Sequence, residues 1–178
     1  ILYGGDEFSS RKSLNDQILI MRSYPLIYKT IVELGYDINY FVQGEIKTVE
    51  TYNWRPIDFV QLNDIKSYGL EMTIKVLNNK EFEVIDSEQI KKGLFLFDKE
   101  FNYNKSKFTI RFNDSFVLPH NEKFPVIVIK WKNPHNIAKS YQNKLIVQKI
   151  KPDASIIEAS VKGQDVSKDV TFLNKLTE

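Results

Sequence analysis

The side chains that most often carry chemistry are sparse in this chain of 178 residues. Cys is absent, and the only two histidines, His120 and His135, each follow a proline in a turn-like context. Zinc and iron sites gather several imidazole or thiolate ligands, so isolated histidines of this kind are typical of solvated loops. The sequence therefore predicts no metal site and no cofactor.

Motifs that place a nucleophile or a phosphate group are also absent from the sequence. There is no Gly-x-Ser-x-Gly elbow, no Gly-x-x-x-x-Gly-Lys-Ser/Thr loop and no Gly-x-Gly-x-x-Gly turn. A Ser-His-Asp triad without such an elbow has little support, and kinase or NAD chemistry would have to lie elsewhere. We predict no catalytic residue in this chain.

Paired carboxylates are the one arrangement that could still give an enzyme. A glycoside hydrolase needs only two carboxyl groups across a cleft, and the nearest candidates are Asp6 with Glu7 and Glu81 with Glu83. Acidic residues are frequent on strand and loop surfaces, so such spacings arise by chance. We therefore interpret these acidic residues as part of a solvated face. A carboxylate hydrolase is the weakest of the three functional hypotheses that we weigh for this chain.

Aromatic residues make up 13% of the chain and allow two interpretations. An exposed row of rings, for example Trp54 or Trp131, would stack on sugars and indicate a carbohydrate-binding β module. Rings that alternate with polar residues and share a strand face with aliphatic side chains instead predict a β core. Two runs show this second pattern: Phe82 with Val84, and Phe108 with Ile110 and Phe112.

The charge and hydropathy of the chain limit the classes of partner that it can bind. The chain has 25 Lys and Arg against 23 Asp and Glu, a formal net charge of +2, and the two signs alternate. Nucleic acid is a poor candidate because phosphate binding needs clustered cations. The longest apolar run, 124–131, is interrupted by Pro125 and Lys130, and it is far shorter than the roughly 20 residues that span a bilayer.

The clearest helical pattern runs from Ser13 to Leu34, with apolar residues recurring on one side. Pro25 is unfavourable inside a helix but is tolerated in a first turn. We therefore expect two helices with a break at 23–25, where Ser23 caps the second helix and Ser13 the first. Gly35 supplies the left-handed residue that ends the second helix.

From Ile38 to Trp131 the apolar period changes to two, which predicts an antiparallel meander. A strand pair bent at Gly44 opens it, and Asn78-Asn79 marks a hairpin turn. The expected strands cover apolar positions 40–49, 57–62, 70–76, 82–85, 94–97, 107–112 and 126–131.

The last part of the chain predicts a helix over 134–143, strands over 145–150 and 156–161, and a final helix from 165 onward. Asn133 with Pro134 can start the first of these helices, and Asp165 or Ser167 the last. The predicted fold class is α+β, as one domain over 1–178 with a β-rich insertion at 44–131 and a closing helix-strand-strand-helix over 133–178.

Both ends of the chain resemble the extracytoplasmic domain of the polysaccharide chain-length determinant family, the Wzz-like polysaccharide co-polymerases. At the N-terminal end the similar segments are Ser13–Ser23, with its Arg-Ser centre, and Ile31–Tyr36, with its Leu-Gly end. At the C-terminal end they are Leu145–Val147, Ser155–Ser160 and the Phe-Leu-Asn-Lys-Leu of 172–176. The large middle region suggests the exporter branch associated with bacterial tyrosine autokinases.

The resemblance implies a non-enzymatic domain on the periplasmic face of the bacterial inner membrane, anchored by flanking helices outside this sequence. Members of the family form homo-oligomeric rings that set the chain length or export of capsular and other surface polysaccharide. The implied partners are other copies of the chain, the polymerase or export machinery and polysaccharide itself. A cytoplasmic tyrosine kinase domain, where a member has one, follows C-terminally.

Two expectations about surfaces follow from the resemblance. The outer face of 13–34 and the terminal helix would make the contacts between copies. No Gly, Asn or Pro stop signal follows Leu176, so the terminal helix would continue into a longer protein. We then expect it to fray near Glu178 and to leave Phe172 or Leu176 partly exposed.

Overall fold

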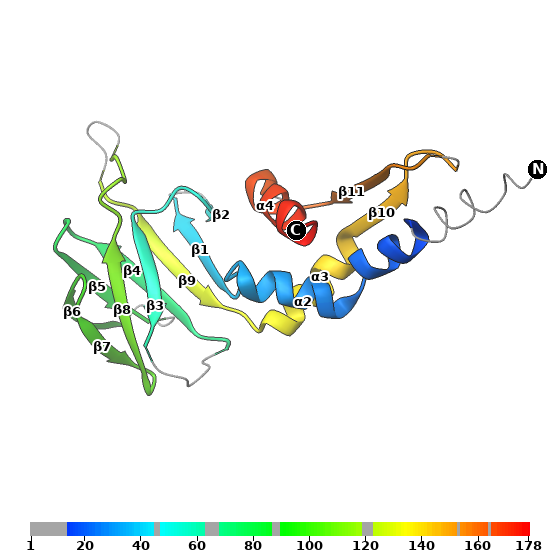
Figure 1. Cartoon of the computed structure of the whole chain (residues 1–178). Helices are drawn as coiled ribbons and strands as arrows, with labels where there is room; N and C mark the ends of the chain where they lie inside the picture. The colour runs from blue at the N-terminus through cyan, green and yellow to red at the C-terminus, as the bar shows by residue number, and fades with distance from the viewer. Residues whose placement is uncertain are drawn as a thin grey trace, which may run out of the picture. The chain divides into compact units, whose positions relative to one another are not determined.

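The computed structural model describes residues 14–44, 47–62, 68–86, 90–118, 123–152, 154–163 and 165–178 (Figure 1). The predicted cap Ser13, the carboxylates Asp6 and Glu7, and His120 lie outside these residues. The chain divides into two compact units, one formed by 1–37 with 134–178 and the other by 38–133. We call them the helical unit and the β unit. The β unit starts at Ile38, before the predicted insertion at 44–131.

The predicted α+β class is confirmed, with helices at the two ends of the chain and antiparallel sheets between them (Figure 1). The helical unit contains a helix over residues 14–21 and a two-stranded sheet. Its other elements are α2 (Tyr24–Glu33), α3 (Pro134–Lys144), β10 (Leu145–Lys149), β11 (Ile157–Val161) and α4 (Val166–Leu176).

The predicted break between the first two helices is confirmed. The first helix ends where the Ser23 N–H donates to the Ile20 carbonyl at 3.0 Å. Ser23 is extended, with φ −69° and ψ 136°, and Pro25 lies in the first turn of α2, where its missing N–H costs nothing. Ser23 holds the cap position, but its side chain makes no capping hydrogen bond.

Gly35 ends α2 as the sequence predicts. Its φ is +62°, in the left-handed region that glycine adopts without a Cβ penalty. The Gly35 N–H donates to Val32 at 3.1 Å, and the Tyr36 N–H reaches back to Ile31 at 3.2 Å. This pair of bonds is the Schellman arrangement, which satisfies carbonyls that the last turn of a helix leaves open.

The β unit is built from two antiparallel sheets. The six-stranded sheet has the order β2-β1-β9-β4-β5-β6 and the three-stranded sheet the order β3-β8-β7. The strands are β1 (Ile38–Gln43), β2 (Thr48–Thr51), β3 (Ile57–Gln61), β4 (Glu71–Val76), β5 (Glu81–Ile85), β6 (Lys91–Leu96), β7 (Glu100–Tyr103), β8 (Ser106–Phe112) and β9 (Val126–Trp131).

Most strands match the predicted ones, including the β1–β2 pair and the β4–β5 hairpin. The prediction missed β7, which is short and reads Glu-Phe-Asn-Tyr. A tight turn with positive φ at Asn104 (45°) and Lys105 (65°) folds it onto β8. Neither residue is glycine, and asparagine alone is a weaker signal of a left-handed turn than glycine.

The core of the β unit lies between the inner faces of its two sheets, and aromatic rings dominate it. Phe82 and Phe108 are fully buried, and the ring centroids of Phe59 and Phe108 are 4.8 Å apart. The predicted alternation is confirmed, because Val84 and Ile110 are buried on the same strand faces as these rings. The aromatic content of the chain therefore serves packing first.

Candidate interface on the helical unit

The final helix is fixed to the end of α2 through the main chain. The Tyr36 hydroxyl donates to the Lys168 carbonyl at 2.7 Å, and the Lys168 ammonium lies 5.0 Å from the centroid of the Tyr36 ring. Tyr36 itself is buried. The predicted cap of α4 is confirmed, since the Asp165 side chain accepts from the Lys168 N–H at 3.0 Å. Together these contacts set the position of α4 within its unit.

The expectation that Phe172 or Leu176 would be partly exposed is wrong. Phe172 is 0% and Leu176 is 4% exposed. The ring of Tyr141 on α3 packs against Phe172, so that α4 buries this face within the unit. The helix also ends in an ordered way, because the Thr177 N–H donates to the Asn174 carbonyl at 3.2 Å.

A cationic group joins the last turn of α4 to α2. The Lys175 ammonium lies 2.8 Å from a Glu178 carboxylate oxygen and 3.7 Å from one of Glu33. The hydrogen bond that Lys175 donates to Glu178, assisted by the charges of Glu178 and Glu33, raises the pKa of Lys175 above its usual value. A cation in the last turn also faces the negative end of the helix dipole.

The opposite face of α4 presents apolar side chains to solvent. Val166 is 77% and Val170 is 48% exposed, and they lie one helical turn apart on the same side. Phe172 projects from the other side of the helix into the unit. The outer surface of α4 therefore carries two exposed valines beside the exposed polar residues Ser167 and Asn174.

The helices at 14–21 and α2 also have apolar outer positions. Leu19 is 67%, Ile20 is 59% and Val32 is 49% exposed, whereas Ile27 and Ile31 on the inner side of α2 are fully buried. Single exposed apolar residues are ordinary in proteins. Their recurrence on two consecutive helices makes these helices part of the candidate interface.

The hairpin β10–β11 buries apolar side chains on one face and exposes isoleucines as well as polar side chains on the other. Leu145 and Val147 are buried on one face of β10. Ile146, Ile150 and Ile156 are more than half exposed on the other face, where Ile150 lies beside Ile156. The hydrogen-bonded side chains of Gln148 and Glu158 separate this pair from Ile146. Among the described residues, each of these two strands pairs only with the other.

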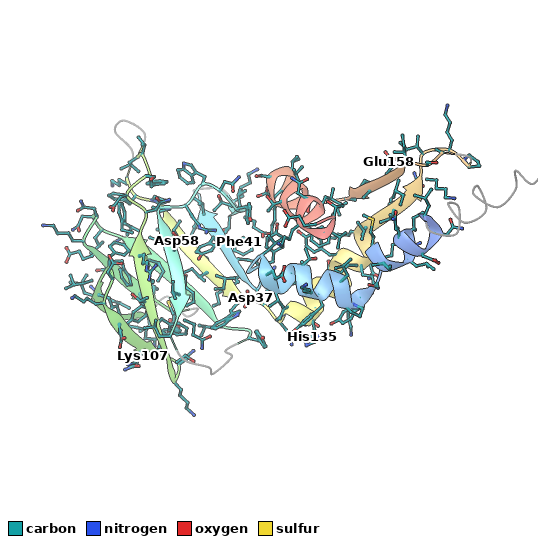
Figure 2. All side chains as sticks on the ribbon, in the orientation of Figure 1. Asp37, Phe41, Asp58, Lys107, His135 and Glu158 are labelled. Atoms are coloured by element: carbon teal, nitrogen blue, oxygen red, sulfur yellow. The ribbon has the colours of Figure 1, made fainter. Side chains whose placement is uncertain are left out.

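His135 (labelled in Figure 2) lies in the first turn of α3, so the prediction of a loop histidine is wrong for this residue. Its ring stacks on Tyr28 of α2 at a centroid distance of 4.4 Å. The Tyr24 hydroxyl and His135 Nδ1 are hydrogen-bonded at 2.5 Å. His135 therefore joins α3 to α2. Its aromatic partners, Tyr24 and Tyr28, lie more than a hundred positions earlier in the sequence.

The carboxylate pair that falls within the described residues has a structural environment. Glu81 and Glu83 project from the same face of β5, not toward one another across a cleft. Glu81 accepts from the Asn78 side-chain amide at 2.9 Å, and Glu83 lies 2.5 Å from the Lys91 ammonium. This geometry lacks the opposed carboxyl groups of a glycoside hydrolase.

Two surveys of the described residues complete the description. In the segments that the structure covers, no three His, Cys, Asp or Glu side chains come together in a way that could hold a metal ion. Within those same segments, no helix has the length and apolar character needed to cross a membrane. Of the two tryptophans of the chain, Trp54 is exposed and Trp131 is buried.

Comparisons with known proteins give little. No family model and no curated protein matches the chain. Two crystal structures of FlgL from Xanthomonas campestris, in space groups H3 and C2, each align with a TM-score of 0.32 and 10% sequence identity. Each alignment covers 79% of this chain and 40% of the FlgL chain. A TM-score this low does not indicate a shared fold.

Proposed function

We propose that this chain is the extracytoplasmic domain of a membrane-anchored protein that regulates the chain length or export of surface polysaccharide. It acts without catalysis, by assembling with further copies of itself into a ring at the periplasmic face of the inner membrane. In this proposal the geometry of the ring sets the length or export of the polysaccharide, and the ring binds the polymerase or export machinery. A cytoplasmic tyrosine kinase domain in the same protein would belong to the exporter branch.

One observation carries this proposal. The segments that resemble the family lie at opposite ends of the sequence, yet they fold together in the helical unit and leave the β unit as a separate body. Tyr36, at the end of one segment, donates to the main chain of α4, and Lys175 of the other pairs with Glu33. Because these segments resemble parts of a single domain of the family, the proposal requires them to fold together.

The exposed apolar side chains of the helical unit support self-association. A ring needs two different surfaces on each protomer, because a head-to-tail contact must repeat around a rotation axis. Val166 and Val170 form one exposed apolar pair on α4, and Ile150 and Ile156, next to the ends of β10 and β11, form another. Both lie outside the core of the unit.

Assembly of the whole protein tests the proposal. We expect the complete reading frame, purified from membranes in mild detergent, to give a closed homo-oligomer in native mass spectrometry. The double change Val166→Lys and Val170→Lys should dissociate the oligomer and shift the length distribution of surface polysaccharide on gels. Burying a lysine ammonium in place of an apolar contact is costly, which is the physical reason for the loss.

The matched control is Val49→Lys, because Val49 on β2 of the β unit is 48% exposed, as Val170 is. That variant should keep both the oligomer and the polysaccharide length distribution. A monomeric wild-type protein would refute the ring. So would a polysaccharide length distribution that stays the same when the assembly is lost.

A further inference from the structure

Trp54 is exposed in a way that its residue type rarely is. It is 45% exposed, whereas Trp131 is 5% exposed and every other described Phe, Tyr and Trp is buried or half-buried. The row of exposed rings expected for a carbohydrate-binding module is thus not present among the described residues. A single pair of rings takes its place, since Trp54 lies beside Phe116 with centroids 5.0 Å apart and planes tilted by 60°.

Two loops at one end of the three-stranded sheet bring these rings together. Ile57, at the start of β3, pairs with Phe112, at the end of β8, so the loops 52–56 and 113–118 leave the sheet side by side. The Asn113 N–H donates to the Pro56 carbonyl at 2.8 Å, and its side-chain amide donates to the Arg55 carbonyl at 3.3 Å. Asn113 therefore ties the two loops together.

Arg55 holds the loop that carries Trp54 in place. The Arg55 guanidinium donates to Asp58 at 2.9 Å and to the Tyr52 carbonyl at 3.1 Å. It also lies 4.4 Å from the centroid of the Tyr40 ring. Figure 2 labels Asp58 on its strand. A loop fixed by a planar cation in this way loses little freedom when a ligand binds, which favours affinity.

A further hydrogen bond closes the same loop at the main chain of Trp54. The Thr51 hydroxyl donates to the carbonyl of Trp54 at 2.7 Å. Phe116 is held in its own loop, where its N–H donates to the Asn113 carbonyl at 2.8 Å. Hydrogen bonds within and between the two loops therefore fix the backbone that carries the exposed Trp54 indole.

We propose that Trp54 and Phe116, together with Val117, form a binding site for a hexopyranose chain, which we call the aromatic tip. Val117 is 80% exposed and extends the apolar surface. The C–H face of a pyranose ring is flat and apolar and packs on an indole, while its hydroxyl groups need hydrogen-bond partners at the ring edge. Polar side chains exposed in the same two loops can supply them: Asn53, Asp114 and Ser115.

The charge of the two loops separates this ligand from a membrane surface. Arg55 and Asp114 are their only charged side chains, so the loops carry no net charge, and Arg55 is already paired with Asp58. Binding to an anionic bilayer relies on clustered cations around the apolar residues. The described residues of these two loops hold no such cluster, and a neutral sugar chain is the ligand that their chemistry fits.

The two tryptophans of the chain make the proposal directly measurable. Cellohexaose, maltohexaose and laminarihexaose are titrated into the full chain while the emission and acrylamide quenching of tryptophan are followed. At least one of these sugars should shift the emission to the blue and shield one tryptophan. Buried Trp131 should contribute a constant background.

Variants assign the signal to the tip. Trp54→Ala should weaken binding by about tenfold or more, the scale on which loss of a central aromatic contact is measured. Trp54→Phe should retain most of the affinity, which shows that the ring itself binds. Val49→Ala, an exposed change elsewhere in the β unit, should leave binding as it is, and each variant should keep the thermal midpoint of the wild type.

Three results would overturn the proposal: no binding of any of the three sugars, equal binding by wild type and Trp54→Ala, or binding of phosphatidylcholine vesicles that competes with the sugar. The inference does not rest on the proposed function. Loss of sugar binding leaves the oligomer measured by native mass spectrometry unaffected, and a monomeric protein can still bind sugar. The two proposals therefore fail separately.

Discussion

The ring of Tyr141 lies 4.4 Å from the ring of Phe172, centroid to centroid, and the Tyr141 hydroxyl donates to an Asp169 carboxylate oxygen at 3.2 Å. One side chain of α3 thus contacts α4 through both an apolar ring and a polar group. The apolar contact buries Phe172 completely. This relationship explains why the last helix packs into its unit and does not leave it.

Replacing the buried ring should therefore loosen the helical unit. We expect Phe172→Ala to destabilise it by about 3–5 kcal/mol, because the truncation removes buried apolar surface and leaves a cavity. Hydrogen exchange of the backbone amides of α2 and α4 measures this free energy locally. Both tryptophans lie in the β unit, so their fluorescence reports separately on that unit.

The control for Phe172 is an exposed residue of the same helix. Val170→Ala should change amide protection in α4 by less than about 1 kcal/mol, since surface substitutions usually have small effects. Equal loss of protection in the two variants would mean that α4 is not anchored through Phe172. Unfolding of the β unit in Phe172→Ala would show that the two units do not open independently.

A second prediction concerns the end of α2. Gly35→Ala should destabilise the helical unit by about 1–2 kcal/mol, because a Cβ is unfavourable in the left-handed region. No neighbouring atom lies within 4 Å of the position that the Cβ would occupy, so backbone strain is the only cost. Thermal unfolding of the unit, followed by far-UV circular dichroism, measures the change.

Gly35→Asn is the matched comparison, since asparagine tolerates left-handed backbone better than alanine does. Its midpoint should fall between those of the wild type and Gly35→Ala. If the alanine variant were as stable as the wild type, α2 would have to end in another conformation in solution. The Schellman hydrogen bonds of Gly35 and Tyr36 would then be absent as well.

Much of the fold could be predicted because its local signals agree with its packing. Pro25 and Gly35 have backbone preferences that few residues share, so they mark the break before α2 and the end of α2. Strands with buried inner faces show the period of two that a half-buried sheet requires. Short β7 escaped detection because it has only four residues and its turn uses Asn104 and Lys105 in place of glycine.

The candidate surfaces were harder to predict because they depend on contacts between distant parts of the chain. Whether Phe172 faces solvent or Tyr141 is decided by how α3 and α4 pack, and the sequence around Phe172 fits both outcomes. The same holds for Trp54 and Trp131, one exposed and one buried. Exposure of Trp54 follows from the pairing of β3 with β8, and periodicity along either strand does not reveal it.

The third prediction concerns pH and the edge of the six-stranded sheet. The hydrogen bond from the Lys91 ammonium, and its charge, lower the pKa of Glu83 below the usual 4.5. A carboxylate with a lowered pKa in the folded state adds stability above its unfolded pKa, and that stability is lost as the pH falls through the folded value. The pair should thus stabilise the β5–β6 edge at neutral pH, and this contribution should decline as the pH falls below the ordinary glutamate pKa of about 4.3.

Lys91→Gln tests this by removing the cation and keeping a side chain of similar length. The difference in thermal midpoint between wild type and Lys91→Gln, read from tryptophan fluorescence, should be present at pH 7 and shrink toward zero at pH 3. The effect at pH 7 should be small, because exposed ion pairs contribute little. Lys99→Gln, which removes the same charge in the turn before β7, should show no such pH-dependent difference. A difference for Lys91→Gln that persists unchanged to pH 3 would mean that Lys91 acts through packing and not through the charge of Glu83.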